Sequence, residues 1–134
     1  MLETYYLRES LVLLTLEELE TRNLAPIREY EFHQLVRKIQ PQDQIVFRYI
    51  DEPISYSYDL SGFIEMLERK ALVDNFILIN GGLTRTNNYQ LTRVGRAEAR
   101  DWMQDVRLRR DLTERIRLGI ESSVLLLTES LEVR

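Results

Sequence analysis

The stretch that decides the fold runs from Ser57 to Met103 and reads SYDLSGFIEMLERKALV (57–73), DNFILINGGLTRTNNYQLT (74–92) and RVGRAEARDWM (93–103). Three local patterns follow one another in it without a gap. The first is typical of an amphipathic helix, the second of two strands joined by a glycine turn, and the third of another helix. The stretch therefore predicts a small antiparallel hairpin held between two helices.

The first of these helices has one apolar side. Its apolar residues recur at spacings of three and four, and they are Leu60, Phe63, Ile64, Leu67 and Ala71. Such spacing places them on one face of a helix. Ser57 or Asp59 can cap the start by accepting a hydrogen bond from a backbone N–H. The outward positions are then Ser61, Gly62, Glu65, Glu68 and Arg69.

The hairpin follows directly. Residues 72–79 are rich in β-branched and aromatic residues, and Asn80-Gly81-Gly82 supplies the positive φ angles that a tight turn needs. Residues 88–91 predict the returning strand, so 83–87 would form a polar loop or wing. Thr92 stands at the N-cap position of the next helix.

Two runs in this stretch resemble winged-helix regulators of the PadR and MarR kinds. Tyr89–Arg96 (YQLTRVGR) is similar to the Tyr-x-Leu-Thr-x-x-Gly run that closes the wing and opens the following helix in those families. Residues 68–73 (ERKALV) are similar to the end of their third helix, with Ala71 where glycine is usual. The resemblance covers about residues 24–103. It implies a winged helix-turn-helix fold and, as the usual role, transcription regulation.

The rest of the chain adds helices on both sides. Residues 5–20 and a segment from Ala25-Pro26 to about 39 predict the first two helices. The buried side of the second would comprise Ile27, Tyr30, Phe32, Leu35, Val36 and Ile39. Residues 44–50 fit a strand or a short buried helix equally well.

Apolar residues continue the pattern after the hairpin. We expect inward positions at Val94, Ala97, Trp102 or Met103, Val106, Leu108, Leu112, Ile116 and Ile120. Gly119 is expected to loosen or break the last helix. The sequence thus predicts a mainly α protein with a small antiparallel β-hairpin. It would be a single winged helix-turn-helix domain over 1–134, with a core at about 24–103 and flanking helices at about 5–20 and 104–132.

Charge is distributed unevenly along the chain. The net charge is −4, which does not favour broad affinity for nucleic acids. Residues 1–92 carry 9 basic and 14 acidic residues, whereas 93–118 carry 8 arginines and 5 acidic residues. The acidic Glu17, Glu18 and Glu20 end the first helix, where we expect a solvated face. Positive charge is concentrated after the wing.

No pattern indicates catalysis, a metal site or a bound cofactor. The chain has no cysteine and a single histidine, His33, which we expect to be structural or on the surface. No Gly-Lys-Ser/Thr follows Gly81-Gly82, so this pair is not a phosphate loop. The N-terminus lacks the basic region of a secretory signal, and no apolar run could span a bilayer. We expect a cytoplasmic protein that is not an enzyme.

Two functions remain open. The first is a dimeric regulator that binds double-stranded DNA through the third helix and the wing. Its candidate contacts are Ser57, Ser61, Gly62, Glu65, Arg69, Thr84, Arg85, Thr86, Asn87, Asn88, Arg93 and Arg96. The second is a module that contacts a basic protein through the acidic third helix, the wing or the aromatic corner at 56–58. The charge of that helix favours the second function, because phosphate neutralisation supplies most non-specific DNA affinity. Most winged helices bind DNA, however, so the resemblance favours the first, which is our prediction, with the second as its alternative.

The two ends of the chain resemble each other. Glu9–Leu14 and Leu19-Glu20 match Glu121–Leu126 and Leu131-Glu132 at most positions. Two amphipathic segments can be alike by chance. Alternatively, both ends pack together and pair across a homodimer, as flanking helices do in the families that the chain resembles.

Overall fold

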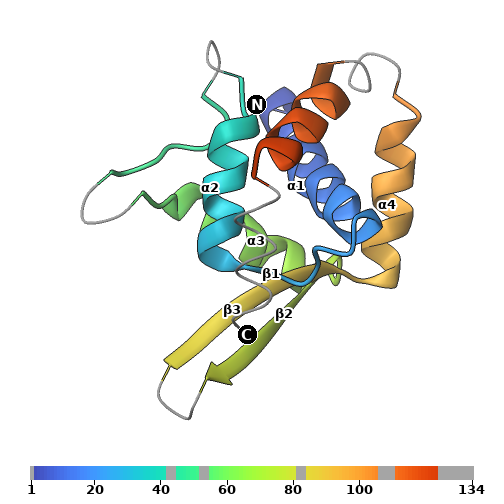
Figure 1. Cartoon of the computed structure of the whole chain (residues 1–134). Coiled ribbons are helices and arrows are strands. Elements are labelled where there is room, and N and C mark those ends of the chain that lie inside the picture. The colour runs from blue at the N-terminus through green and yellow to red at the C-terminus, as the bar shows by residue number, and fades with distance from the viewer. Residues whose placement is uncertain (1, 42–44, 52–54, 81–83, 106–110, 124–134) are drawn as a thin grey trace.

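The computed structural model describes residues 2–41, 45–51, 55–80, 84–105 and 111–123 (Figure 1). Within them the chain is mainly helical and has one small antiparallel sheet. The elements are α1 (Leu2–Thr21), β1 (Ile27–Arg28), α2 (Glu29–Ile39), α3 (Tyr58–Arg69), β2 (Val73–Asn80), β3 (Thr84–Leu91) and α4 (Arg93–Met103). Residues 111–123 form a further helix, here named the C-terminal helix.

The first helix is the centre of the fold. α1 packs against α4, α2 and β3, and Leu11–Leu14 are at most 4% exposed. Even its polar Thr15 is fully buried, and its hydroxyl donates to the Leu11 carbonyl oxygen at 2.6 Å. A helix surrounded by protein needs no polar stripe, which explains why its apolar residues are not confined to one face. The predicted helix is confirmed, but the middle of α1 is covered by its own chain and so is not free for a dimer.

The sheet has the strand order β1-β3-β2, and all its strands are antiparallel. The predicted hairpin between 72 and 91 is therefore confirmed. For the segment predicted as a polar loop or wing, 83–87, the loop interpretation is wrong in the described part, because the returning strand β3 begins at Thr84 and not at Asn88. Pairing continues residue by residue from Val73 opposite Leu91 to Asn80 opposite Thr84. Gly81 and Gly82 lie outside the described residues.

The start of the second helix was predicted wrongly. Ile27 and Arg28 are not helical, because their backbones pair with Tyr89 and Asn88 of β3, and α2 begins only at Glu29. This pairing joins segments 60 residues apart, so local pattern could not indicate it. Tyr30 is 52% exposed, which contradicts its predicted burial. The other predicted core positions of α2 are buried, namely Phe32, Leu35, Val36 and Ile39.

The segment between α2 and α3 is neither a strand nor a helix in its described part. Its only pairing there is an isolated bridge between Ile50 and Tyr56. Val46 and Phe47 are nevertheless buried. The Gln40 side chain accepts from the Phe47 N–H at 3.0 Å and donates to its carbonyl oxygen at 3.2 Å. The Gln40 side chain thus satisfies the backbone N–H and C=O groups of Phe47 that a neighbouring strand would otherwise bind. Val46 and Phe47 can therefore be buried although they lie in a loop.

The third helix forms as predicted except at its end, because it stops at Arg69 and the expected apolar position Ala71 lies beyond it and is exposed. Ser57 caps it, since its hydroxyl accepts from the Leu60 N–H at 3.0 Å. Phe63 and Leu67 are buried. The chain leaves the helix through Ala71, whose φ of 61° lies in the left-handed region. This is the position at which the resembling families carry glycine, and glycine adopts such a conformation without strain.

The fourth helix is capped by Thr92, whose hydroxyl accepts from the Gly95 N–H at 2.9 Å. Gly95 lies against the chain that follows α3: a Cβ there would be 2.0 Å from the Leu72 carbonyl oxygen. This contact sets the rotation of the helix. Gly95 and Ala99 face inward, while Val94 is 56% exposed and Ala97 is exposed, so the predicted burial of the latter two is wrong.

The C-terminal helix carries the predicted apolar stripe at Leu112, Ile116 and Ile120, all buried. Gly119 does not break this helix. It lies inside it, where a Cβ would meet the Ile39 side chain at 2.6 Å. Val106, Leu108 and the end of the predicted flanking helix lie outside the described residues. No helix among the described residues combines the length and the apolar character needed to cross a bilayer.

Candidate interaction surface

The exposed side of α3 is a regular stripe. Tyr58, Gly62, Glu65 and Arg69 follow one another at spacings of four, three and four, and all four are exposed. Residues so spaced share one face of a helix. Tyr58 is 71% exposed. We name these four residues the α3 stripe.

Side chains of α2 hold the start of α3 in place. The buried His33 accepts from the Ser57 N–H through Nδ1 at 3.2 Å, and its ring stacks on Tyr56 with centroids 4.4 Å apart. Arg37 donates to Asp51 and to the Ser55 hydroxyl. These contacts tie the segment before α3 to α2, so the direction of the α3 stripe is set by the core rather than by a loose loop.

His33 stays neutral in this position. Burial lowers its pKa from 6.5 to about 4, against a smaller opposing effect of the Glu29 carboxylate. A protonated imidazole would carry a hydrogen on Nδ1 and could no longer accept from the Ser57 N–H. The expectation that His33 is a structural residue is thereby given a specific role, which is to position the α3 N-terminus.

Gly62 leaves the α3 backbone uncovered. A Cβ at this position would have no atom within 4 Å, so nothing inside the protein requires glycine here. Glycine in a helix interior costs about 1 kcal/mol relative to alanine. A residue that weakens the helix without an internal packing reason is compatible with close approach of a partner to the backbone.

The charge around the stripe is not positive. Glu65 and Arg69 offset each other, and the half-buried Glu68 and the exposed Asp74 of β2 add acidic groups. Burial raises the pKa of the Glu68 carboxyl, partly offset by a hydrogen bond from Asn75. Lys70 follows the helix, but its ammonium group points back to the Tyr5 hydroxyl and the buried Glu9 carboxylate.

The hairpin contributes exposed apolar side chains. Phe76 and Ile77 of β2 are 42% and 58% exposed. They are consecutive in a strand, so they lie on opposite faces of the hairpin. Both faces of the hairpin therefore present apolar surface to solvent.

The predicted DNA contacts do not form one group. Ser57 and Asn88 are fully buried; the Ser57 hydroxyl caps α3, and the Asn88 amide donates to the carbonyl oxygens of Thr86 and Phe76. Neither side chain can reach a bound molecule in this conformation, which contradicts the predicted contacts. Ser61, Thr86 and Asn87 are half-buried, and Gly62, Glu65, Arg69 and Arg93 are exposed. The side chains of Thr84 and Arg85 lie outside the described residues.

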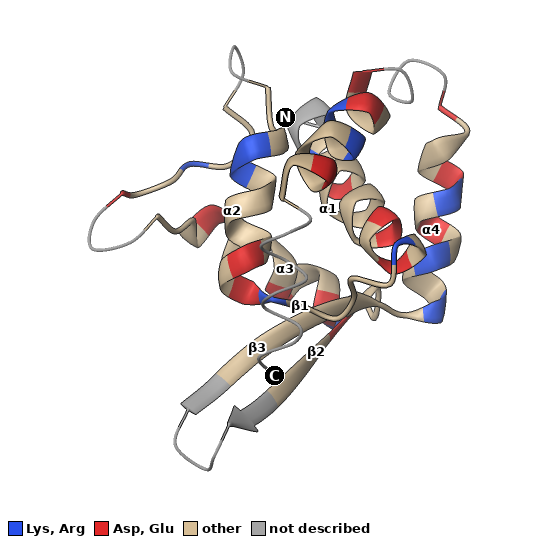
Figure 2. Ribbon diagram, viewed as in Figure 1, with Lys and Arg blue, Asp and Glu red and all other residues tan. Residues whose placement is uncertain are grey.

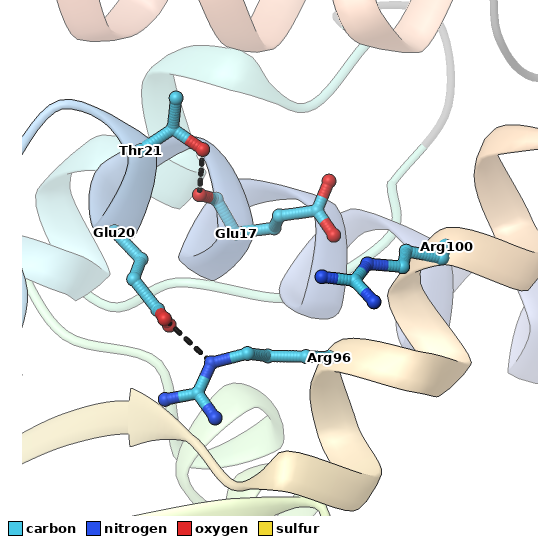
Figure 3. A pocket seen from close by; sticks show the side chains of 5 residues that line it. All are labelled: Glu17, Glu20, Thr21, Arg96 and Arg100. Atoms are coloured by element: carbon cyan, nitrogen blue, oxygen red, sulfur yellow. Dashed lines mark hydrogen bonds and ion pairs between the residues drawn. The ribbon is translucent and has the colours of Figure 1, made fainter.

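Arg96 has an intramolecular partner. Its guanidinium donates to the Glu20 carboxylate of α1 at 2.5 Å, and Arg100 extends toward Glu17 one turn further along α4 (Figure 3). The acidic end of α1 and the basic start of α4 thus offset each other across the contact between the two helices (Figure 2). The face expected to be solvated is therefore half-buried at Glu17 and Glu20, and Glu20 forms an ion pair across the helix contact.

These charged side chains line a shallow hollow of about 360 Å³ together with Thr21 (Figure 3). Burial raises the pKa of the Glu17 carboxyl, while the nearby Arg100 guanidinium lowers it. The Thr21 hydroxyl in the hollow donates to the backbone carbonyl oxygen of Glu17 at 3.0 Å and is thereby held within α1. Among the described residues, no three His, Asp or Glu side chains are close enough together to hold a metal ion.

No protein-family model matches the chain, and no curated protein or solved structure is significantly similar to it. The exposed residues that sequence reasoning missed are Phe76, Ile77 and Asp74. A run of apolar residues in a strand normally indicates burial on both faces. The polar returning strand at 84–88 was the one signal that this part of the hairpin lies outside the core.

Proposed function

We propose that this protein is a winged-helix module that binds another protein through the α3 stripe. The strand order β1-β3-β2 supports the fold part of this proposal. A short strand ahead of the second helix joins a two-stranded wing that follows the third helix, and this is the arrangement of a winged helix. Thr92 and Gly95, the threonine and glycine of the resembling run, also support it, because Thr92 caps α4 and Gly95 lies against the Leu72 carbonyl oxygen where the hairpin passes into that helix.

The observation that carries the functional part is the composition of the α3 stripe. It combines an exposed aromatic ring at Tyr58 with an uncovered backbone at Gly62, and its two charges offset each other. An aromatic side chain beside a flat surface is typical of protein interfaces. DNA binding instead relies on a surplus of positive charge facing the phosphates, which the described part of this surface does not have.

The partner that fits this surface is a basic one. Glu65 and Arg69 both act electrostatically on Glu68. Asp74 at the start of β2 is exposed, and the whole chain carries a net charge of −4. Complementary charge speeds association and disfavours acidic competitors. A partner surface that carries lysine or arginine around an apolar contact for Tyr58 would match it.

Sequence-independent contact with double-stranded DNA is the second candidate. Arg69 at the end of the α3 stripe and Arg93 at the start of α4 are both exposed, and they favour this alternative. Two arginines are a small number for a DNA-binding face. Each neutralised phosphate contributes only about one unit to the slope of log affinity against log salt concentration.

Photo-crosslinking in living cells tests the two candidates together. A benzoyl-phenylalanine placed at Tyr58 keeps an aromatic side chain in the α3 stripe, and the same residue at Val94 is the matched control on α4. Both positions are more than half exposed. We expect a protein adduct from position 58 that Glu65→Arg weakens and that does not form from position 94.

A nuclease-sensitive adduct from position 58 would replace the proposal with DNA binding. Equal adducts from 58 and 94, or none from 58, would show that the α3 stripe is not a binding surface. A titration of random-sequence duplex DNA at low salt, read by fluorescence anisotropy, gives an independent answer, because non-specific electrostatic binding is strongest there.

A further inference from the structure

The outer edge of β2 has no partner strand. β3 lies between β1 and β2, so one side of β2 faces away from the sheet along its whole length, as Figure 1 shows for the hairpin that extends past the helices. Within the described residues, the backbone from Asp74 to Asn80 pairs only with β3. Its outward N–H and C=O groups are therefore available to another strand.

This edge lacks the features that usually prevent strands from pairing. Edge strands of monomers are commonly short, carry lysine or proline, or contain a bulge. β2 has eight residues and neither lysine nor proline, and its register with β3 has no bulge. The exposed Phe76 and Ile77 lie at its middle. An unprotected, apolar edge of this length is suited to pairing.

The occupant that the geometry favours is a second copy of the same edge. In the described residues the opposite edge of the sheet, β1, is only two residues long. Head-to-tail pairing, with β2 of one copy on β1 of the next, would therefore form few backbone hydrogen bonds. Two copies of β2 can instead pair about a two-fold axis, which satisfies both edges at once and closes the assembly.

Charge agrees with this arrangement. Asp74 is the only charged residue of β2. In an antiparallel pair centred on Ile77, Asp74 lies opposite residue 80 of the other copy, an asparagine, and the two Asp74 residues are about 20 Å apart at a rise of about 3.3 Å per residue. Phe76 lies opposite residue 78, a leucine. Residues 76 to 78 then pair apolar with apolar, Asn75 lies opposite residue 79, an isoleucine, and no like charges meet.

We infer that this protein forms a two-fold symmetric dimer in which the β2 strands of two copies pair antiparallel around Ile77 and join their sheets into one. This inference does not rest on the proposed function of the α3 stripe. It also differs from pairing through terminal helices, because the contact is made by the wing.

Single cysteines test the register directly, since the chain has none of its own. Directly opposite residues in an antiparallel pair have Cβ atoms about 4.5–5.5 Å apart, close to the span of a disulfide. Under mild oxidation we expect Ile77→Cys to form a disulfide-linked dimer at least tenfold faster than Asn75→Cys, which would lie opposite residue 79. Val94→Cys is the control for random collision, because Val94 is as exposed as Ile77.

Sedimentation velocity of the full chain tests the dimer itself. We expect the dimer to predominate as the protein concentration approaches about 100 µM, because a contact of micromolar Kd is then largely occupied. Ile77→Lys should make the chain monomeric, because two lysines would meet at the axis, and Val94→Lys should leave the dimer intact. A monomeric parent chain, a dimer that survives Ile77→Lys, or equal disulfide rates at 75, 77 and 94 would each overturn the inference. Crosslinking from position 58 should be the same with and without Ile77→Lys. A failure of the dimer inference therefore leaves the test of the α3 stripe intact.

Discussion

Acidification should destabilise this protein through His33 before it affects most carboxylates. The folded state keeps His33 neutral, with a pKa of about 4, whereas the free imidazole has a pKa of 6.5. The folded pKa is the lower one, so the unfolded chain takes up a proton first as the pH falls. The contribution of His33 to stability is therefore complete above pH 6.5 and is lost as the pH falls toward 4.

The size of the effect follows from the two pKa values. A difference of about 2.5 pKa units corresponds to about 3.4 kcal/mol in total, at about 1.36 kcal/mol per unit. Between pH 7 and pH 5 the expected loss is about 2 kcal/mol, because most of the protonation of the unfolded chain occurs in that interval. The pKa values of the Glu17 and Glu68 carboxyls are raised by burial and act in the opposite direction, so the parent chain alone does not isolate His33.

The assay compares urea unfolding of the parent chain and of His33→Asn at several pH values. The Asn side chain keeps an acceptor near the position of Nδ1 for the Ser57 N–H but cannot be protonated. We expect His33→Asn to be less stable at pH 7, because the stacking on Tyr56 is lost. The difference in unfolding free energy between the two proteins should then shrink by about 2 kcal/mol on going to pH 5. Parallel pH profiles for both proteins would refute this account of His33.

Three glycine and alanine positions give further predictions. Gly62→Ala should stabilise the chain by about 1 kcal/mol in urea unfolding and at the same time weaken the crosslinking from position 58; unchanged crosslinking would mean that Gly62 does not serve contact. Ala71→Gly should stabilise by about 0.5–1 kcal/mol, since the φ of 61° strains alanine; a loss of melting temperature would contradict this. Gly95→Ala should destabilise by about 2–3 kcal/mol, because its Cβ would overlap the Leu72 carbonyl oxygen; calorimetry that finds no change would show that α4 can shift at no cost.

Local chemistry was sufficient to predict the elements around the hairpin. Ser57 and Thr92 cap their helices because hydroxyl side chains satisfy the first free N–H groups of any helix. The apolar spacing at Leu60 to Leu67 and at Leu112 to Ile120 likewise predicted which residues are buried. These features depend on residues within a few positions of one another, so the sequence states them directly.

Long-range contacts decided the rest. Residues 27–28 form a strand because their backbones pair with the edge of β3. Arg96 was predicted as a DNA contact, but it lies against Glu20, 76 residues earlier in the chain. Ser57 and Asn88 were plausible surface contacts by composition and are buried by packing.

The sequence alone therefore determined that these helices and the hairpin exist, and which residues cap α3 and α4, because these features depend on short-range spacing and hydrogen bonding. Only the tertiary structure decided which charges are paired, which apolar side chains remain exposed and which edge of the sheet is open. Each of those properties is a relation between residues far apart in the chain. Both proposals, binding through the α3 stripe and pairing through β2, depend on surfaces that the tertiary packing leaves exposed, namely the outer side of α3 and the unpaired edge of β2.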